Sequence, residues 1–562
     1  MTAGAVGDAV AARLAEWERE RVAERLWQRD VSLWSSSGAK PDDLGDRLGW
    51  LDLPSTMGAH VDELIGLAEE AWADGYRQAA VLGMGGSSLA PELFGGLAAA
   101  GLALRATDAR LPVRVLDSTH PDAVRAFGEW ASSARTLFLV SSKSGTTTEP
   151  LAYHAAMAEQ ASGSDFIAIT DPGTPLADLA RDQGFRSVIQ APADVGGRYS
   201  ALTVFGLAPA ALAGIDVSGL LDRAAAMAER CRRPGADNPG MRLGAVIGEA
   251  VRNGRDKLTF LLPRELAGFG DWVEQLLAES TGKQGTGIVP IVREPLGDPS
   301  AYGRDRAFVA ISLPGGSGAQ VSRLAAQLEE QGQPVERIDI GDPLEIGGEF
   351  VRWEVATATA GMLLGIDPFD QPNVQESKDA TKSLLETYAR DGALPQQMPL
   401  VAEQGMAAFG DAEVLGDVPP TVASAVRRLL EISDAGDYFA ILAYLPMEPS
   451  TIARLEALRA RVRDALGLAT TLGFGPRFLH STGQLHKGGP ESGVFLQLTA
   501  DPRRDLPIPG WNETFATLIA AQAQGDLASL AKRRRRALRV HLGEVDAGLD
   551  RLATLVDEAL GG

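Results

Sequence analysis

Short apolar runs alternate with helical stretches along most of this chain, and this alternation limits the fold more than any other feature. Four runs in the first half are typical of buried strands: 78–82, 113–116, 136–140 and 166–170. A second series begins near Asp256, with candidate strands at 257–262, 287–292, 306–313 and 335–340. Strands that alternate with helices form parallel sheets with helices on their faces. The sequence therefore predicts an α/β protein with two doubly wound parallel sheets, whose ligands gather at the carboxyl ends of the strands.

The chain of 562 residues is too long for one hydrophobic core, so we expect several domains. An N-terminal helical segment is expected over 1–75, with the apolar anchors Trp17, Leu26, Trp27, Leu33 and Trp34. The two sheet domains are placed at 76–240 and 241–390, and a further α/β region at 391–562. This last region has candidate strands at 438–445, 470–473 and 494–498 and ends in helical sequence from about 511 to 560.

Composition excludes several classes of partner. The formal net charge of −21 argues against nucleic acid or an anionic membrane as a general partner. No run reaches the ~18 apolar residues of a membrane helix, and acidic residues interrupt the N-terminus where a signal peptide needs an apolar core. The one cysteine, Cys231, allows no intrachain disulfide and fits a reducing compartment. We expect a soluble, cytoplasmic protein.

Two further features of the sequence give no indication of additional chemistry. The chain has no H-E-x-x-H motif and no clustered Cys/His set, so neither a metal nor another cofactor is expected. The basic run Lys532–Arg536 falls in the C-terminal helical sequence, where we interpret it as a solvated helix face rather than a polyanion site.

A hydroxyl-rich turn follows the strand predicted at 136–140. Its residues are Ser142-Lys143-Ser144-Gly145-Thr146-Thr147-Thr148-Glu149, and a helix is expected from about Leu151. Backbone N–H groups and the dipole at a helix start favour an anion, the hydroxyls donate to phosphate oxygens, and the lysine adds a full charge. The alternative is a turn that only caps the helix. We favour a phosphate site.

Glycines follow the first predicted strand, in Gly83-Met84-Gly85-Gly86-Ser87-Ser88. Closely spaced glycines let backbone N–H groups approach a ligand. A dinucleotide site is the rival interpretation, since Asp117 ends the next strand as a ribose-binding acid would. However, Ser88 stands where the third glycine of G-x-G-x-x-G belongs, so nicotinamide binding ranks below sugar-phosphate binding.

Two charged residues are candidates that local sequence leaves open. Arg198 follows Gly196 and Gly197, and its planar donors suit a carboxylate, a phosphate or an oxyanion, although from the local sequence alone a structural ion pair is the safer interpretation. Glu279 lies four residues after Gln275 and shares its helical face. From the residues alone, Glu279 is more readily a solvated glutamate than a catalytic base.

Five segments occur in an order that resembles the motif series of the glucose-6-phosphate isomerase family: 83–91, 142–149, 194–200, 275–283 and 369–378. That family is built from two sugar-isomerase (SIS) domains, and the resemblance covers about residues 75 to 380. The last segment, with the long tail after it, is most similar to the isomerase part of fused transaldolase–isomerase chains, although no transaldolase portion is present here.

The resemblance implies an aldose–ketose isomerase (EC 5.3.1.9) that interconverts glucose 6-phosphate and fructose 6-phosphate through a cis-enediol. It implies these positions for the site: Ser142, Ser144 and Thr147 at the phosphate, Gly86 and Ser87 along the sugar, and Lys143, Gly197 and Arg198 facing the reacting carbons. It further implies Glu279 as the base, Gln275 and Gln371 as positioning groups, and Lys378 as a participant in ring opening.

The sequence departs from the family pattern at several points. Asn373 and Gln375 replace the usual glycine and glutamate, and Ala201 replaces a larger residue. More seriously, 303–308 holds no histidine where the family places its ring-opening residue. Among the six histidines we favour His486, or else His480, as the replacement, with a structural histidine as the alternative.

Other functions and assemblies stay open at this level. One is a dual phosphoglucose/phosphomannose isomerase, and another is a non-catalytic SIS regulator that binds sugar phosphates. A regulator would not need Glu279, Arg198 and Lys378 together, which weighs against it. The family commonly forms homodimers, but the added C-terminal region could replace contributions from a partner chain.

Overall fold

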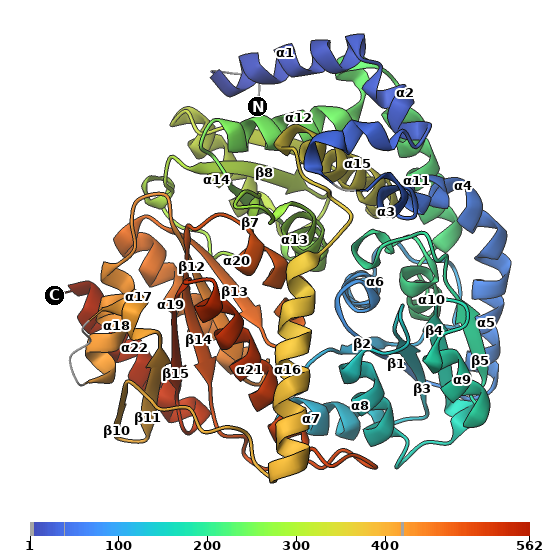
Figure 1. Cartoon of the computed structure of the whole chain (residues 1–562). Coiled ribbons are helices and arrows are strands. Elements are labelled where there is room, and N and C mark those ends of the chain that lie inside the picture. The colour runs from blue at the N-terminus through green and yellow to red at the C-terminus, as the bar shows by residue number, and fades with distance from the viewer. Residues whose placement is uncertain (1–4, 39, 417–420, 562) are drawn as a thin grey trace.

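The computed structural model describes residues 5–38, 40–416 and 421–561, and three β-sheets organise them (Figure 1). The N-terminal segment consists of short helices: α1 (Ala5–Arg19), α2 (Val22–Trp27), α3 (Pro41–Gly45), α4 (Leu53–Thr56) and α5 (Val61–Ala73). Trp17, Leu26, Leu33 and Trp34 are buried, whereas Trp27 is only partly covered. These side chains belong to one hydrophobic core that continues through the first and second sheets.

The first sheet is entirely parallel and has the strand order β2-β1-β3-β4-β5. Its strands are β1 (Gln78–Gly83), β2 (Val113–Leu116), β3 (Thr136–Ser141), β4 (Phe166–Thr170) and β5 (Ser187–Gln190). Helices α6 (Leu89–Ala99), α7 (Pro121–Ala131), α8 (Thr148–Met157), α9 (Pro175–Asp182), α10 (Val204–Ala213) and α11 (Val217–Cys231) accompany it. The strand order reverses between β1 and β3, so the turns after these two strands flank a crevice.

The second sheet repeats this plan with the parallel order β7-β6-β8-β9. Its strands are β6 (Lys257–Leu261), β7 (Val289–Ile291), β8 (Arg306–Ser312) and β9 (Val335–Asp339). The accompanying helices are α12 (Pro239–Arg252), α13 (Ala267–Thr281), α14 (Ala319–Glu330) and α15 (Ile346–Leu364). The predicted α/β class with parallel sheets is confirmed, and the boundaries proposed at 75, 240 and 390 stay predictions.

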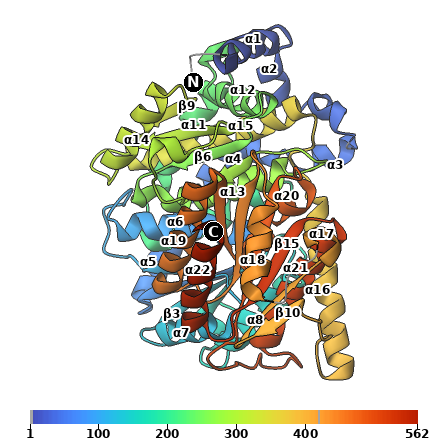
Figure 2. The same ribbon diagram turned by 90° about the vertical axis from the view of Figure 1, so that its left-hand side faces the viewer.

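The third sheet has the order β10-β11-β15-β14-β12-β13 and its own core. Strands β12 (Tyr438–Tyr444), β13 (Ala469–Phe474), β14 (Gly493–Thr499) and β15 (Arg536–His541) are parallel, and the hairpin β10 (Val401–Glu403) and β11 (Met406–Gly410) adds an antiparallel edge. The helices here are α17 (Ala412–Leu415), α18 (Val422–Glu431), α19 (Pro449–Leu466), α20 (Gly483–Gly488), α21 (Phe515–Lys532) and α22 (Val545–Gly561). Figure 2 shows this region from the side, with α18, α19 and α22 toward the viewer.

The prediction of continuous helical sequence from 511 to 560 is wrong, because strand β15 interrupts it. Helix α21 ends at Lys532, and Arg534 then takes a left-handed conformation with φ 53° that turns the chain into β15. Arg533 and Arg536 pair with Glu376 and Asp437. Arg533, Arg535 and Arg536 are therefore structural anchors, whereas Lys532 and Arg534 stay exposed to solvent.

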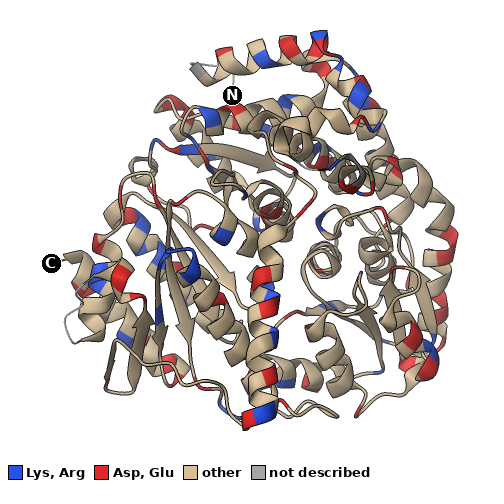
Figure 3. Ribbon diagram, viewed as in Figure 1, with Lys and Arg blue, Asp and Glu red and all other residues tan. Residues whose placement is uncertain are grey.

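Helix α16 (Pro372–Asp391) lies between the C-terminal region and the first sheet (Figure 1). It packs against α21 and α20, and Figure 3 shows acidic and basic residues alternating along it. Its N-terminal turns carry the last of the five motifs. This motif therefore lies between the C-terminal region and the first sheet. Among the described residues, no helix has the length and apolar character that crossing a membrane requires.

Candidate active site

Two glycine-containing turns and helix α13 meet at the carboxyl end of β1. A Cβ on Gly86 would lie 1.9 Å from the carbonyl oxygen of Gly197, so the two backbones touch directly. Gly85 has φ +54°, and a Cβ there would lie 2.8 Å from Nε2 of Gln275 on α13. Ser87 is buried beside them. The predicted residues Gly86, Gly197 and Gln275 thus come together, and no side chain would fit at Gly85 or Gly86.

Gly86→Ala is expected to destabilise the protein by about 1–3 kcal/mol, because the added methyl group forces two backbones apart. Gly96→Ala is the matched control, since Gly96 lies in the neighbouring helix α6 with no heavy atom within 4 Å of its Cβ position. Its change should be neutral or stabilising by about 0.5–1 kcal/mol. Urea unfolding measures both, and equal stability of the two variants would contradict this packing.

Arg198 is the centre of the site and its side chain is 3% exposed. Its Nε donates to Oγ of Ser280 at 2.7 Å, and Nη2 donates to the carbonyl oxygens of Pro368 and Asp370 at 2.8 and 2.9 Å. Nη1 donates to Oε1 of Gln371 at 2.9 Å and lies 3.3 Å from Oε1 of Glu279. The guanidinium therefore joins the first sheet domain, α13 and the start of α16, and it is held in one orientation.

Glu279 lies in the last turn of α13 with donors at both carboxylate oxygens. Arg198 approaches Oε1, and Nε2 of Gln275 donates to Oε2 at 3.1 Å. The same amide nitrogen also donates to the backbone carbonyl of His480 at 2.8 Å. The side chain of Glu279 is 11% exposed. A carboxylate placed in this way is paired with a cation, fixed in orientation and partly open, as a proton acceptor must be.

His480 reaches the site from the C-terminal region. It ends the 3₁₀ helix Arg477–His480 after β13, and its Nε2 lies 3.2 Å from Oε1 of Glu149 at the start of α8. Burial alone would raise the pKa of the Glu149 carboxyl, but His480 and Lys378 outweigh burial and lower that pKa. Glu149 is therefore an ionised partner for the histidine.

Arg477 anchors this 3₁₀ helix to both SIS-like sheets. Its guanidinium pairs with Asp117 at 3.0 Å and with Glu92, both from the first sheet domain, and lies 3.5 Å from Asp271 on α13. All of these side chains are shielded from solvent except part of Glu92. In a dinucleotide site Asp117 would be free to bind a ribose. Here it pairs with Arg477 and so helps to fix the position of His480.

One cavity of about 670 Å³ is lined by residues of the hydroxyl-rich turn 142–149, called the phosphate turn below, and by His480 and Lys378. The turn contributes Ser144, Thr146, Thr147 and Glu149, and α16 contributes Lys378. In the described part of the chain the Lys378 ammonium has no ion-pair partner, so it is available to a ligand. Ser142 lies behind this wall, where its hydroxyl donates to Thr147 at 2.9 Å.

Glu279, Arg198, Gln275 and Gln371 also lie outside the lining of this cavity. Two further predicted positions differ more strongly from the expectation, and Lys143 is the first of them. Its ammonium pairs with Asp171 and donates to the carbonyl oxygen of Ala193 at 3.0 Å, and Lys143 does not line the cavity. Its side chain is committed to these partners and does not face Glu279 in this structure. The positive charges near the cavity and the carboxylate come from Lys378 and Arg198 instead.

The preference for His486 is the second and is corrected, because its ring lies in an aromatic core. The ring centroid is 5.9 Å from that of Phe478 and 5.1 Å from that of Phe495, and burial lowers its pKa well below the usual value. Residues 483–488 form the short helix α20 that packs against α13. Of the two histidines, His480 is the one that reaches the cavity.

Sequence reasoning missed two polar residues of the site, Ser280 and Gln522. Ser280 directly follows Glu279 and receives Nε–H of Arg198. Gln522 lies on α21 and donates from Nε2 to Oε1 of Glu149 at 2.7 Å. The motif around Glu279 could have suggested Ser280, but no local pattern marks Gln522, which is 373 positions from Glu149.

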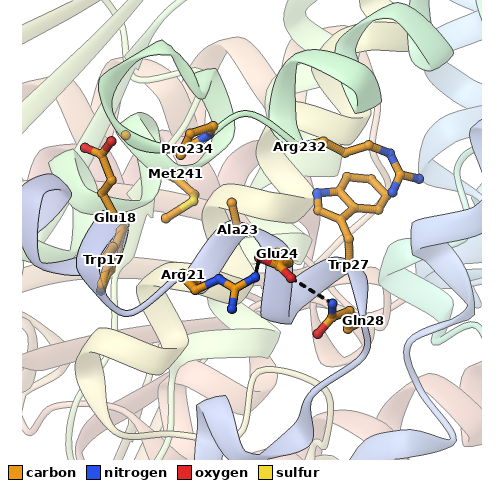
Figure 4. A pocket seen from close by; sticks show the side chains of 11 residues that line it. Trp17, Glu18, Arg21, Ala23, Glu24, Trp27, Gln28, Arg232, Pro234 and Met241 are labelled. Carbon is orange, nitrogen blue, oxygen red and sulfur yellow. Dashed lines mark hydrogen bonds and ion pairs between the residues drawn. The ribbon is translucent and has the colours of Figure 1, made fainter.

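A second cavity, of about 560 Å³, lies among α1, α2 and the segment between α11 and α12 (Figure 4). The guanidinium of Arg232 covers the indole of Trp27 at 4.0 Å, and Glu24 pairs with Arg21 and accepts from Gln28. None of the predicted site residues lines it. The chemistry is therefore assigned to the cavity beside His480, which several of the predicted residues line.

Comparison with known proteins agrees with this geometry. No family model matches the chain. A probable glucose-6-phosphate isomerase of Haloarcula marismortui is 29% identical, over 54% of this chain and 77% of that protein. A glucose-6-phosphate isomerase of Rubrobacter xylanophilus is 27% identical, over 62% and 90%. A crystal structure of a hypothetical protein from Thermus thermophilus has the same fold, with a TM-score of 0.56, 23% identity, and coverage of 68% of this chain and 98% of that one.

A third relative decides the family. The probable glucose-6-phosphate isomerase of Natronomonas pharaonis is 31% identical, and the match covers 55% of this chain and 80% of that protein. The buried arginine–carboxylate pair, the hydroxyl-lined turn and this identity agree, and the chain belongs to the glucose-6-phosphate isomerase family.

Proposed function

We propose that this chain catalyses the reversible isomerisation of glucose 6-phosphate and fructose 6-phosphate. The observation that carries the proposal is the linked arrangement of Glu279, Gln275 and His480. Gln275 bonds both to the Glu279 carboxylate and to the His480 backbone, while the His480 ring lines the cavity of the phosphate turn. A base for carbon chemistry is thus joined through Gln275 to a residue that lines a cavity suited to a sugar phosphate, although Glu279 itself does not line that cavity.

The phosphate is assigned to the turn between β3 and α8. Hydroxyls of Ser144 and Thr147 line the cavity, and Ser142 supports Thr147 from behind. The N-terminus of α8 adds backbone N–H groups and a favourable dipole for a dianion. Binding energy from this distant phosphate helps to hold the reacting carbons in line with the base.

Ring opening is assigned to His480 and Lys378. The C1 hydroxyl loses a proton, the ring oxygen gains one, and the C1–O5 bond breaks to leave an aldehyde at C1. An imidazole paired with a carboxylate can both donate and accept this proton. His480 takes the place of the predicted His486, because it lines the same cavity as Lys378.

The isomerisation step is assigned to Glu279 and Arg198. Glu279 removes the proton on C2, the C2–H electron pair forms the C1–C2 double bond of a cis-enediol, and charge builds up on the C1 oxygen. Arg198 stabilises that charge with a preorganised guanidinium. The proton of the C2 hydroxyl passes to the C1 oxygen, and Glu279 returns its proton to C1 as the C2–O bond becomes a carbonyl, which gives the ketose.

A coupled assay tests the proposal. Fructose 6-phosphate is supplied with a glucose-6-phosphate dehydrogenase, and turnover should match that of an isomerase and persist with a chelator. In D₂O the product glucose 6-phosphate should carry deuterium at C2, because a carboxylate exchanges its proton with solvent. Binding without turnover would favour the regulator, and equal turnover of mannose 6-phosphate would favour the dual isomerase.

Two further points concern the assembly of the protein and its location in the cell. The proposed mechanism needs no residue of a second copy, because His480 and Glu279 of one chain are joined through Gln275. A homodimer and a cytoplasmic location both stay predictions.

A further inference from the structure

We propose that Gln522 is a positioning residue for ring opening, which acts by orienting Glu149 toward His480. The inference rests on the proposed function and adds to it a residue from the C-terminal region. Gln522 lies in the middle of α21, is 3% exposed, and lines the cavity together with Glu149 and His480.

A single carboxylate oxygen connects the two side chains. Oε1 of Glu149 accepts from Nε2 of Gln522 at 2.7 Å and lies 3.2 Å from Nε2 of His480. The shorter contact is the one to the glutamine. The amide therefore fixes where Oε1 lies, and Oε1 in turn fixes the plane of the imidazole and the nitrogen that it engages.

Gln522 is itself held at its other end. Its Oε1 accepts from the hydroxyl of Thr119 at 2.7 Å, in the buried segment that leads from β2 to α7. The carboxylate of Glu149 decides the direction of the amide, because it only accepts hydrogen bonds and Nε2 must therefore face it, which leaves Oε1 to accept from the Thr119 hydroxyl. Gln522 thus has one buried orientation, and that orientation presents a donor to the carboxylate.

The amide of Gln522 is a neutral hydrogen-bond donor to Glu149. A neutral donor keeps Glu149 as an acceptor for the histidine without competing for its proton. With Nε2 of His480 turned to Glu149, Nδ1 is the ring nitrogen left for the sugar. Loss of Gln522 would leave a buried carboxylate with one donor fewer and free to turn away from the imidazole.

The test uses Gln522→Leu in the full-length protein, with Glu149→Gln and the double variant. For Gln522→Leu we expect kcat to fall about ten- to hundredfold, in line with the loss of a bond to a charged group. The Kd of 6-phosphogluconate, an open-chain sugar acid with the same phosphate end, should change less than about twofold, since it needs no ring opening.

Two further readouts separate positioning from a structural effect. The deuterium isotope effect on kcat with [2-²H]glucose 6-phosphate should fall toward one, because slower ring opening makes removal of the C2 proton less rate-limiting. In the Glu149→Gln background, Gln522→Leu should cause no further loss, because both act through one oxygen.

Gln497→Leu is the matched control. Gln497 on β14 is also buried, and its Nε2 donates to the carboxylate of Asp526 on the same helix α21 at 3.1 Å, away from the cavity. Its kcat and isotope effect should equal those of the wild type. If Gln522→Leu does not fold, Gln522→Asn, which keeps an amide but is one methylene shorter, is expected to show the same pattern.

Several outcomes would overturn the inference. They are a folded Gln522→Leu or Gln522→Asn variant with wild-type kcat, a loss that multiplies that of Glu149→Gln, or a loss found in the Kd of 6-phosphogluconate, which would mean direct contact with the sugar. A wild-type chain without isomerase activity would instead overturn the proposed function, and this inference with it.

Discussion

Glu279→Gln is expected to lower kcat by a factor between about 10² and 10⁴, because an amide cannot take the proton from C2. Glutamine has the same shape, so the Kd of 6-phosphogluconate should stay within about threefold of the wild type. A coupled assay and equilibrium binding measure the two quantities. The combination of lost turnover and kept binding distinguishes a base from a binding residue.

Glu274→Gln is the control for this experiment. Glu274 lies on the same helix, and burial, followed by the charge of Asp271, raises the pKa of its carboxyl to about 8. At pH 7 the variant therefore replaces a mostly neutral acid with a neutral amide, and turnover should change little. If Glu279→Gln kept the turnover of Glu274→Gln, the assignment of the base would be wrong.

His480→Asn is expected to lower kcat with cyclic substrates by about 10²-fold or more, because the proton transfer at the ring oxygen loses its imidazole. His486→Leu should leave kcat unchanged, since His486 contacts Phe478 and Phe495 and does not line the cavity. Leucine suits that apolar site, so the thermal midpoint of His486→Leu should equal or exceed that of the wild type.

The opposite pattern would contradict the assignment of His480. A folded His486→Leu variant with strongly reduced turnover, beside a His480→Asn variant with normal turnover, would return the role to His486. Circular dichroism of both variants excludes misfolding as the cause of either result.

Local sequence patterns were sufficient for much of the fold. The runs at 78–82, 136–140 and 166–170 became β1, β3 and β4, because strands buried on both faces must be continuously apolar. The turn 142–149 could be recognised for a similar reason, since its hydroxyls and its glycine are consecutive in the sequence, and its role as a phosphate site stays a prediction. Arg198 and Glu279 were found only through the resemblance, and the structure places them 3.3 Å apart.

Long-range contacts explain what the sequence could not predict. His480 and Glu149 are 331 positions apart, and which of two nearby histidines enters the cavity depends on how α20 packs. Strand β15 was missed because its apolar residues follow a basic run that continues a helical pattern. Its partner β14 is about forty residues earlier, and pairing with that strand overrides the local preference.

The most direct test of the central claim is a crystal structure of the protein with 6-phosphogluconate bound. The account predicts that the phosphate contacts the hydroxyls of Ser144 and Thr147 and that the C1–C2 end of the same molecule lies beside Glu279 and Arg198. A molecule whose phosphate lies at that turn while C1 and C2 lie beyond reach of Glu279, or one seated in the cavity around Trp27, would contradict it.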